Sequence, residues 1–122
     1  MKKVMFVFGV LPALVMYSDR LPKPWQGGIT QGPVIRLRPK YIDDAGILAH
    51  ELVHVRQWYR TLFVHPLLYL FSKRYRLTAE AEAYHEQLRH YPDDRAQLFA
   101  TFMATHYGLQ ISVAEAMGAL RR

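Results

Sequence analysis

The most constraining feature of the chain is His50-Glu51-Leu52-Val53-His54, which has the form H-E-x-x-H. An α-helix turns by about 100° per residue, so residues four apart lie one turn apart on nearly the same face. Two imidazoles placed in this way can bind one metal ion. Glu51 lies beside that face, where it can hold a water molecule next to the metal. The spacing therefore indicates a metal site, provided that these residues are helical.

The surrounding sequence predicts a helix over residues 43–60. Asp43 and Asp44 can cap its start and favour the positive end of its dipole. No proline interrupts the stretch, and apolar residues recur at helical spacing, namely Ile47, Leu48, Leu52, Val55 and Tyr59. The alternative interpretation is a pair of ordinary helical histidines without a metal, because so short a motif also arises by chance.

A catalytic zinc site commonly has three protein ligands and one open position, so a third ligand is expected. The extended motif H-E-x-x-H-x-x-G-x-x-H is excluded, since Gln57 and Arg60 occupy its glycine and third histidine positions. The candidates are Glu80 and Glu82, which lie about 200° apart on a second predicted helix, so only one can face the metal. Glu80 is favoured because Ala83, one turn later, would let two helices approach closely.

Glu82 remains the alternative third ligand. It would place Glu86, one turn further on, as an outer carboxylate beside a zinc-bound imidazole. Either glutamate can also be an ordinary solvated residue of a helix.

Two stretches, Leu48–Gln57 and Arg76–Tyr84, together resemble the small gluzincin-type zinc metallopeptidases of bacteria and phages. Such sequences combine H-E-x-x-H-x-x-Q with a later E-x-E-A or E-x-x-A, and the resemblance covers roughly residues 34–90. It implies that Glu80 is the third ligand. It also implies that an edge strand before the active-site helix, at Val34–Arg38, binds an extended peptide. The chain departs from larger gluzincins at Tyr84, where they often carry an aspartate.

The resulting hypothesis is a zinc metallopeptidase in which His50, His54 and Glu80 bind Zn²⁺ and Glu51 is the general base in the hydrolysis of a peptide or protein substrate. The spacing selects no residue to stabilise the oxyanion, and the candidates are Tyr75, Tyr84, His85, His106 and Tyr107. Gln57 either lines the site or faces solvent, and His65 is interpreted as structural. The alternative is a non-catalytic zinc-binding protein with a regulatory or structural role.

Composition limits the remaining function classes. The 122 residues, of which 51% are hydrophobic and 21% charged, predict one globular domain over residues 1–122. The absence of cysteine excludes disulfides and thiolate metal sites. The net charge of +6 is spread along the chain, so a solvated basic surface is favoured. No nucleic-acid partner is expected, and contact with a membrane surface is a lesser alternative.

The first residues fit two interpretations. Lys2 and Lys3 followed by the apolar stretch Val4–Tyr17 have the outline of a signal peptide, but no convincing cleavage site follows. Val4–Phe8 also fits a buried strand that ends at Gly9, which is the favoured interpretation. A cytoplasmic location is therefore favoured, with export or membrane attachment through residues 1–18 as the alternative.

The rest of the sequence predicts a mainly helical α+β fold, and the resemblance implies that this fold is of the zincin type. Residues 18–33 are predicted to form loops, and Val34–Arg38 a strand at the sheet edge. Leu62–Phe71, with a helix that starts near Pro66, fits either a buried segment or one that lies on a membrane surface, and burial is favoured. Further helices are expected from Thr78 to His90, from Pro92 to Gly108, and after the capping box Ser112–Glu115.

Overall fold

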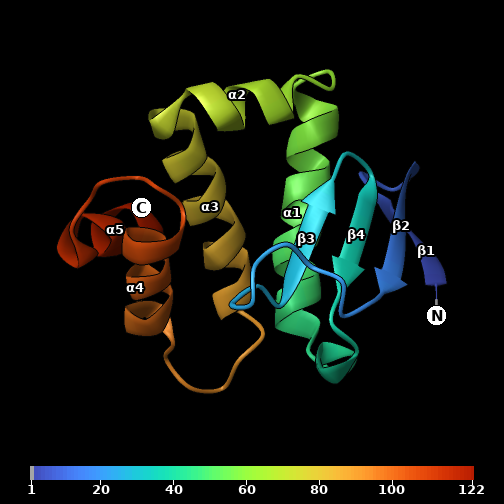
Figure 1. The fold of residues 1–122 in the computed structure, drawn as a ribbon, viewed down its shortest axis with the longest axis horizontal. Coiled ribbons are helices and arrows are strands. Elements are labelled where there is room, and N and C mark those ends of the chain that lie inside the picture. The colour runs from blue at the N-terminus through green and yellow to red at the C-terminus, as the bar shows by residue number, and fades with distance from the viewer. Residues whose placement is uncertain (1) are drawn as a thin grey trace.

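The computed structural model describes residues 2–122, which form a four-stranded sheet followed by five α-helices (Figure 1). The strands are β1 Lys2–Val7, β2 Leu11–Tyr17, β3 Gly28–Gln31 and β4 Val34–Leu37. The helices are α1 Ala45–Arg60, α2 His65–Phe71, α3 Lys73–Leu88, α4 Ala96–His106 and α5 Val113–Leu120. This is the mainly helical α+β class that the sequence predicts.

The sheet consists of two antiparallel pairs that meet at a parallel pair. Its strand order is β1-β2-β4-β3, with β2 and β4 parallel and the two outer pairs antiparallel. Side chains alternate between the faces of a strand, so Ala13, Val15, Ile35 and Leu37 fall on one face. All four are fully buried in a core that also contains Val55 of α1.

The helices form further layers beside the sheet (Figure 1). α1 packs against the sheet on one side and against α3 on the other, and α2 bridges these two helices at one end. A second core lies where α4 and α5 meet α3, around Tyr84, Phe99 and Met103. The two long helices α1 and α3 therefore stand antiparallel in the middle of the molecule.

The predicted helix caps are confirmed at three positions. Asp44 caps α1 by accepting from Ile47 N, and Ser112 and Glu115 form the capping box of α5. Gly108, just after α4, has a positive φ of 63°, a conformation that glycine adopts without strain.

Two predicted helix starts are wrong. α3 begins at Lys73, where Ser72 is the cap, and Thr78 lies inside the helix with its hydroxyl donating to Arg74 O. α4 begins at Ala96 rather than at Pro92, with Asp94 accepting from Ala96 N at 2.9 Å. For α3 the chain offers two capping side chains, Ser72 and Thr78, and the sequence pattern does not choose between them. For α4 the N-cap residue is Arg95, whose side chain makes no cap hydrogen bond.

The predicted edge strand is also wrong. Val34–Arg38 does contain a strand, β4, but β4 is flanked by β2 and β3. The edge nearest α3 is β3, within residues 18–33 that the sequence assigned to loops. β3 was missed because its sequence Gly-Ile-Thr-Gln is short and starts with glycine, a residue that strands disfavour.

The prediction that Leu62–Phe71 is buried is contradicted. α2 begins near Pro66 as expected, but Leu62 is 78% exposed and Phe71 79%. At the other end of the chain, Val4–Phe8 does lie in or next to a strand, yet β1 is the outer strand and only Val7 is buried. No helix within residues 2–122 has the length and apolar character needed to cross a membrane.

Candidate metal centre

The H-E-x-x-H residues lie on α1, and two hydrogen bonds to the Asp44 side chain fix the start of this helix. The Asp44 carboxylate accepts from Ile47 N at 3.1 Å and from the Tyr91 hydroxyl at 2.8 Å. Gly46 allows this contact, because a Cβ at that position would lie 2.5 Å from the Tyr91 ring. Four residues further along, His50 and His54 present their rings from one face of α1, with ring centres 5.0 Å apart.

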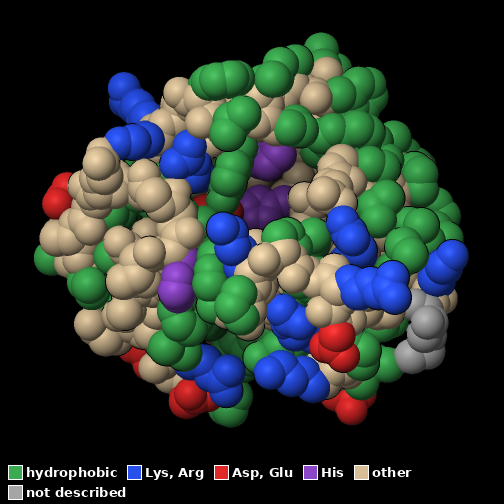
Figure 2. All heavy atoms as spheres, viewed as in Figure 1, with side chains coloured by type: hydrophobic (Ala, Val, Ile, Leu, Met, Phe, Trp, Pro, Cys, Tyr) green, Lys and Arg blue, Asp and Glu red, His purple; other side chains and the backbone are tan. Residues whose placement is uncertain are grey.

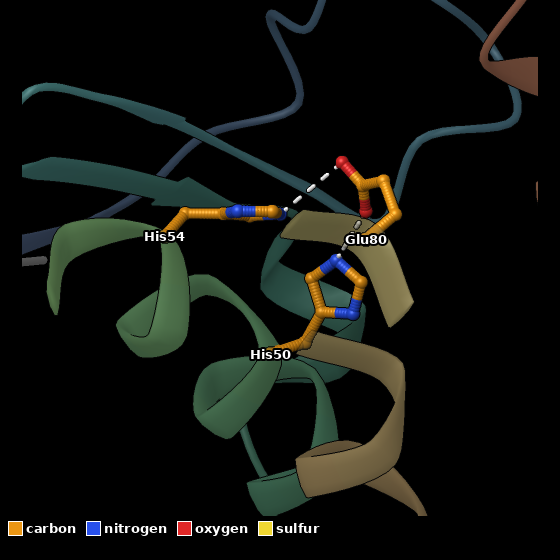
Figure 3. A group of neighbouring side chains, drawn as sticks. All are labelled: His50, His54 and Glu80. Atoms are coloured by element: carbon orange, nitrogen blue, oxygen red, sulfur yellow. Dashed lines mark ion pairs between the residues drawn. The ribbon is translucent and has the colours of Figure 1, made fainter. Parts of the chain in front are cut away.

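Glu80 of α3 completes a cluster with the two histidines (Figure 3). Its Oε1 lies 3.2 Å from His50 Nε2, and its Oε2 lies 3.3 Å from His54 Nε2. All three side chains are buried, with Glu80 only 2% exposed. Ala83 is fully buried in α3, which packs directly against α1. The structure thus brings Glu80, and not Glu82, to the histidine pair.

The buried carboxylate and imidazoles alter one another's ionisation. Burial opposes the charged form of His54, but the negative charge of Glu80 and its close contact raise the pKa of His54 to about 9. Burial likewise opposes ionisation of Glu80, yet the neighbouring His54 and His50 hold the pKa of Glu80 well below its usual range. The carboxylate of Glu80 is therefore ionised although it is buried between the imidazoles of His50 and His54.

Donor types and spacing in this cluster fit a divalent cation. One atom of each residue can be chosen so that all three lie within 4.8 Å of one another. Tetrahedral zinc with ligands at about 2.0–2.2 Å separates neighbouring ligand atoms by about 3.3 Å, close to the contacts seen here. His50 Nδ1 and Glu80 Oε1 are buried without a hydrogen-bond partner among residues 2–122. A metal would satisfy the Glu80 oxygen, since the nearby His50 Nε2 is not aligned to donate to it.

Gln57 forms a hydrogen bond with His54 on the side of the imidazole that faces away from Glu80. His54 Nδ1 donates to Gln57 Oε1 at 2.8 Å, which leaves His54 Nε2 free to face Glu80. Gln57 Nε2 in turn donates to Glu82 Oε1 at 2.7 Å, and Arg60 also donates to Glu82. Gln57, 1% exposed, therefore neither lines the site nor faces solvent. Such a partner fixes the tautomer and orientation of a metal-binding imidazole.

The outer role suggested for Glu86 is contradicted. Glu86 is paired with Arg89 at 3.1 Å and lies near His90, away from the histidine cluster. The carboxylate that supports the site is that of Glu82, which acts on His54 through Gln57. The sequence analysis offered Glu86 for this role only in the case that Glu82 is the third ligand, and the structure places Glu80 at the histidines instead.

Glu51 lies beside the cluster and is tied to the sheet. Thr30 of β3 donates from its hydroxyl to Glu51 Oε1 at 2.7 Å, while Glu51 Oε2 lies 3.9 Å from His50 Nε2. Gly28 lets β3 pack closely on β4, because a Cβ there would lie 2.5 Å from the Leu37 side chain. The hydrogen bond from Thr30 therefore fixes Oε1 of Glu51, whereas Oε2 is on the side of the histidines.

A cleft of about 510 Å³ opens above these residues, between β3 and the helices α1, α2 and α3. His50, Glu51, His54 and Glu80 all line it. Figure 2 shows histidine side chains inside a hollow on this face of the molecule. The three motif residues and the predicted third ligand Glu80 thus share one solvent-accessible space despite their burial.

Tyr69 is a site residue that sequence reasoning missed. Its hydroxyl donates to Glu80 Oε2 at 2.6 Å, and its ring lines the cleft. His65, one turn earlier on α2, also lines the cleft and has its Nδ1 2.6 Å from the Tyr75 hydroxyl. Burial and the nearby His54 lower the pKa of His65 to about 4, so its imidazole is neutral. The i, i+4 spacing of His65 and Tyr69 was the available signal.

The five residues considered as oxyanion donors are distributed unevenly. Tyr107 lines the cleft, and Tyr84 packs its ring 4.3 Å from that of His50 while bonding to Tyr107. His106 is stacked on Trp25 with ring centres 4.2 Å apart. His85 lies outside the cleft, where its Nδ1 donates to Leu120 O. Tyr75 reaches the site only through His65.

Comparisons with protein-family models, with curated proteins and with solved structures found no match to the chain.

Proposed function

We propose that the protein is a zinc-dependent metallopeptidase in which His50, His54 and Glu80 hold the metal and Glu51 is the general base. The observation that carries this proposal is the convergence of the three ligand atoms within 4.8 Å, next to an anchored Glu51, in one cleft. Two imidazoles and one carboxylate form a recurrent ligand set of catalytic zinc. When bound, zinc supplies a Lewis acid that polarises a carbonyl and lowers the pKa of a water molecule to near 7.

Glu51 first accepts and then donates a proton in this reaction. Its Oε1 is held by Thr30, so Oε2 is available to accept a proton from the attacking water. The water oxygen forms a bond to the carbonyl carbon of the scissile peptide. The proton held by Glu51 then passes to the leaving nitrogen as the C–N bond breaks, which returns Glu51 to its ionised form.

β3 is suited to hold the substrate. It has β4 on one side, and residues Gly28 to Gly32 line the cleft on the other. An extended peptide can add to such a sheet edge through main-chain hydrogen bonds. The resemblance assigned peptide binding to Val34–Arg38, and we assign it to β3 instead. Binding of an extended peptide favours unfolded or loop segments of proteins as substrates.

Tyr69 is the hydroxyl best placed to stabilise the oxyanion. It lies in the cleft at hydrogen-bond distance from a ligand carboxylate, on the short helix α2 that closes one end of the site. Burial and the charge of Glu80 raise the pKa of Tyr69 well above its usual value, so its hydroxyl keeps its one proton. That proton is donated to Glu80 Oε2 in this structure, and in the reaction it would turn from the carboxylate to the oxyanion. Neutral His65, its neighbour one turn away, is a second donor at this wall in the tautomer whose Nδ1 accepts from the Tyr75 hydroxyl and whose Nε2 carries the proton.

The test is hydrolysis of a fluorogenic peptide library by zinc-loaded wild type and by Glu51→Gln. We expect Glu51→Gln to bind zinc as wild type does but to lose activity by about 10²–10⁴-fold, the range of general-base catalysis. Glu115→Gln, which makes the same change in the α5 capping box, is the matched control and should keep activity. Activity that survives in Glu51→Gln would refute the mechanism. Bound zinc with no hydrolysis in wild type would favour the non-catalytic alternative.

A further inference from the structure

One end of the molecule carries an exposed apolar surface, which we call the apolar cap and define as residues 62–71 together with the β1–β2 turn 8–10. Its most exposed side chains are those of Phe71, Leu62 and Val10, at 79%, 78% and 76%. Figure 2 shows hydrophobic side chains gathered along the top of the view, over α2, and down the side that carries the hairpin. Monomeric proteins rarely leave so much contiguous apolar surface without a partner.

Aromatic side chains join the two parts of the cap. Phe63 packs against Trp58 and Tyr59, with ring centres 4.5 Å and 6.2 Å apart. The Tyr59 hydroxyl donates to Pro12 O, at the start of β2, at 2.7 Å. The segment that follows α1 and the hairpin turn are therefore parts of one surface.

The backbone at the cap is held in an unfavourable conformation. Phe8, Leu62 and Phe63 have positive φ angles of 51°, 52° and 75°, although none is glycine. Each costs about 1–2 kcal/mol relative to the right-handed region. At Leu62 and Phe63 part of this cost is offset, because their backbone N–H groups donate to Tyr59 O and Trp58 O at the end of α1, and Phe63 packs on Trp58. The Phe8 and Leu62 side chains nevertheless remain exposed, at 56% and 78%.

The charge around the cap is of one sign. Residues 2–18 and 52–79, which contain the whole cap, include no aspartate or glutamate. Lys73 and Arg74 follow Phe71 after one residue, and Lys2 and Lys3 lie on β1, all four exposed. No ion pair joins any of these four to a carboxylate in residues 2–122. In Figure 2 no acidic side chain is visible along the top of the molecule.

We propose that the apolar cap docks on the surface of a membrane that contains anionic lipids. An amphipathic element with an apolar face and flanking basic residues inserts to about 5–10 Å and is attracted by lipid charge. α2 has this character, since Leu67 and Phe71 face outward while His65 and Tyr69 face the cleft. A protein partner would have to be acidic and apolar together, a combination that an anionic bilayer supplies at every point.

Docking would also set the cleft beside the bilayer. Pro66 and Leu70 lie both in the cap and on the cleft wall. The substrates would then be peptide segments that emerge from or lie on the membrane. This last step rests on the proposed peptidase function, whereas the docking itself does not.

The test is co-sedimentation with vesicles of phosphatidylcholine alone and of phosphatidylcholine mixed with phosphatidylserine, using wild type and Glu51→Gln without added metal. We expect both proteins to bind the anionic vesicles and to be released by high salt. Replacing two charges, in Lys73→Gln/Arg74→Gln, should weaken binding about 30-fold. Arg20→Gln/Lys23→Gln removes the same charge elsewhere and should bind far better than that variant.

The apolar contribution is tested by Leu67→Gln/Phe71→Gln, which should bind about tenfold or more weakly. Ile42→Gln/Leu98→Gln, at exposed apolar positions outside the cap, is its control. Circular dichroism melts verify that all variants fold. Wild type that fails to sediment with anionic vesicles, or cap variants that bind as well as their controls, would overturn the proposal. A wild-type dimer that Leu67→Gln/Phe71→Gln converts to a monomer, with no vesicle binding, would assign the cap to a second copy of the chain.

Discussion

Gln57 lies three residues after His54 on α1 and accepts a hydrogen bond from its Nδ1 at 2.8 Å. The side-chain amide of Gln57 then donates to Glu82 on α3, so that a carboxylate on the neighbouring helix orients the imidazole through one intermediate residue. The hydrogen bond between Gln57 and Glu82 thus also connects α1 and α3, the two helices that provide the proposed ligands. This second link holds His54 in one orientation without a metal, whereas His50 Nδ1 has no such partner within residues 2–122.

Gln57→Leu should lower zinc affinity by about 10–100-fold, because outer partners of metal-binding histidines have effects of this size. The affinity is measured by competition with a chromogenic chelator. Gln97→Leu, on the exposed side of α4, is the control and should bind zinc as wild type does. Equal affinities in Gln57→Leu and wild type would show that this hydrogen bond does not serve a metal site.

Zinc should stabilise the fold through Glu80. At free zinc about 1,000 times above the dissociation constant, binding to the native state alone adds about 4 kcal/mol to the free energy of unfolding. For a chain of this size, we expect a rise in Tm of roughly 10 °C or more, reversed by a chelator. Glu80→Gln should abolish the rise. Glu82→Gln, the same change two residues along, should retain most of it, and an identical loss in both variants would argue against Glu80 as a ligand.

Tyr69→Phe separates catalysis from metal binding. Loss of an oxyanion donor typically lowers kcat by about 10²–10³-fold. Zinc affinity should change much less, because Tyr69 contacts only one oxygen of Glu80. Steady-state kinetics and chelator competition are measured on the same preparations, with Tyr59→Phe as a control whose hydroxyl bonds to Pro12 O outside the cleft. If kcat is unchanged in Tyr69→Phe, the donor is another residue, and His65 is the next to test.

Asp44→Ala should reduce the free energy of unfolding by about 2 kcal/mol, because it removes both the cap of α1 and the acceptor of the Tyr91 hydroxyl. Asp43→Ala is the matched control, since Asp43 is exposed and is not the cap residue of α1. Its effect should stay within about 0.5 kcal/mol. Urea unfolding measures both values, and equal losses would show that the helix start is not fixed by Asp44.

The part of the site that lies on α1 could be predicted from sequence because its geometry is local. Four residues of helix determine where His54 stands relative to His50, and Asp44 marks where that helix begins. The choice of Glu80 over Glu82 also followed from helix geometry once Ala83 suggested a close approach. By contrast, the pairing of Gln57 with Glu82 depends on the packing of two helices, which no local pattern specifies.

Other features were missed because tertiary packing overrides composition. β3 is only four residues long and starts with glycine, and it forms because β4 offers a partner on one side and α1 packs against it. Residues 62–71 are apolar enough to suggest a buried segment, yet most of their large side chains are exposed. Tyr69 was overlooked for the same reason, since it shared the apolar stretch that was assigned to the core.

The most direct measurement is an anomalous-scattering difference map from crystals grown with zinc, with data collected above and below the zinc absorption edge. The proposed function predicts one strong peak bounded by His50 Nε2, His54 Nε2 and the carboxylate of Glu80, with Glu51 beside it but not bound to the metal. A peak at other residues, or none at this cluster in zinc-saturated crystals, would contradict it.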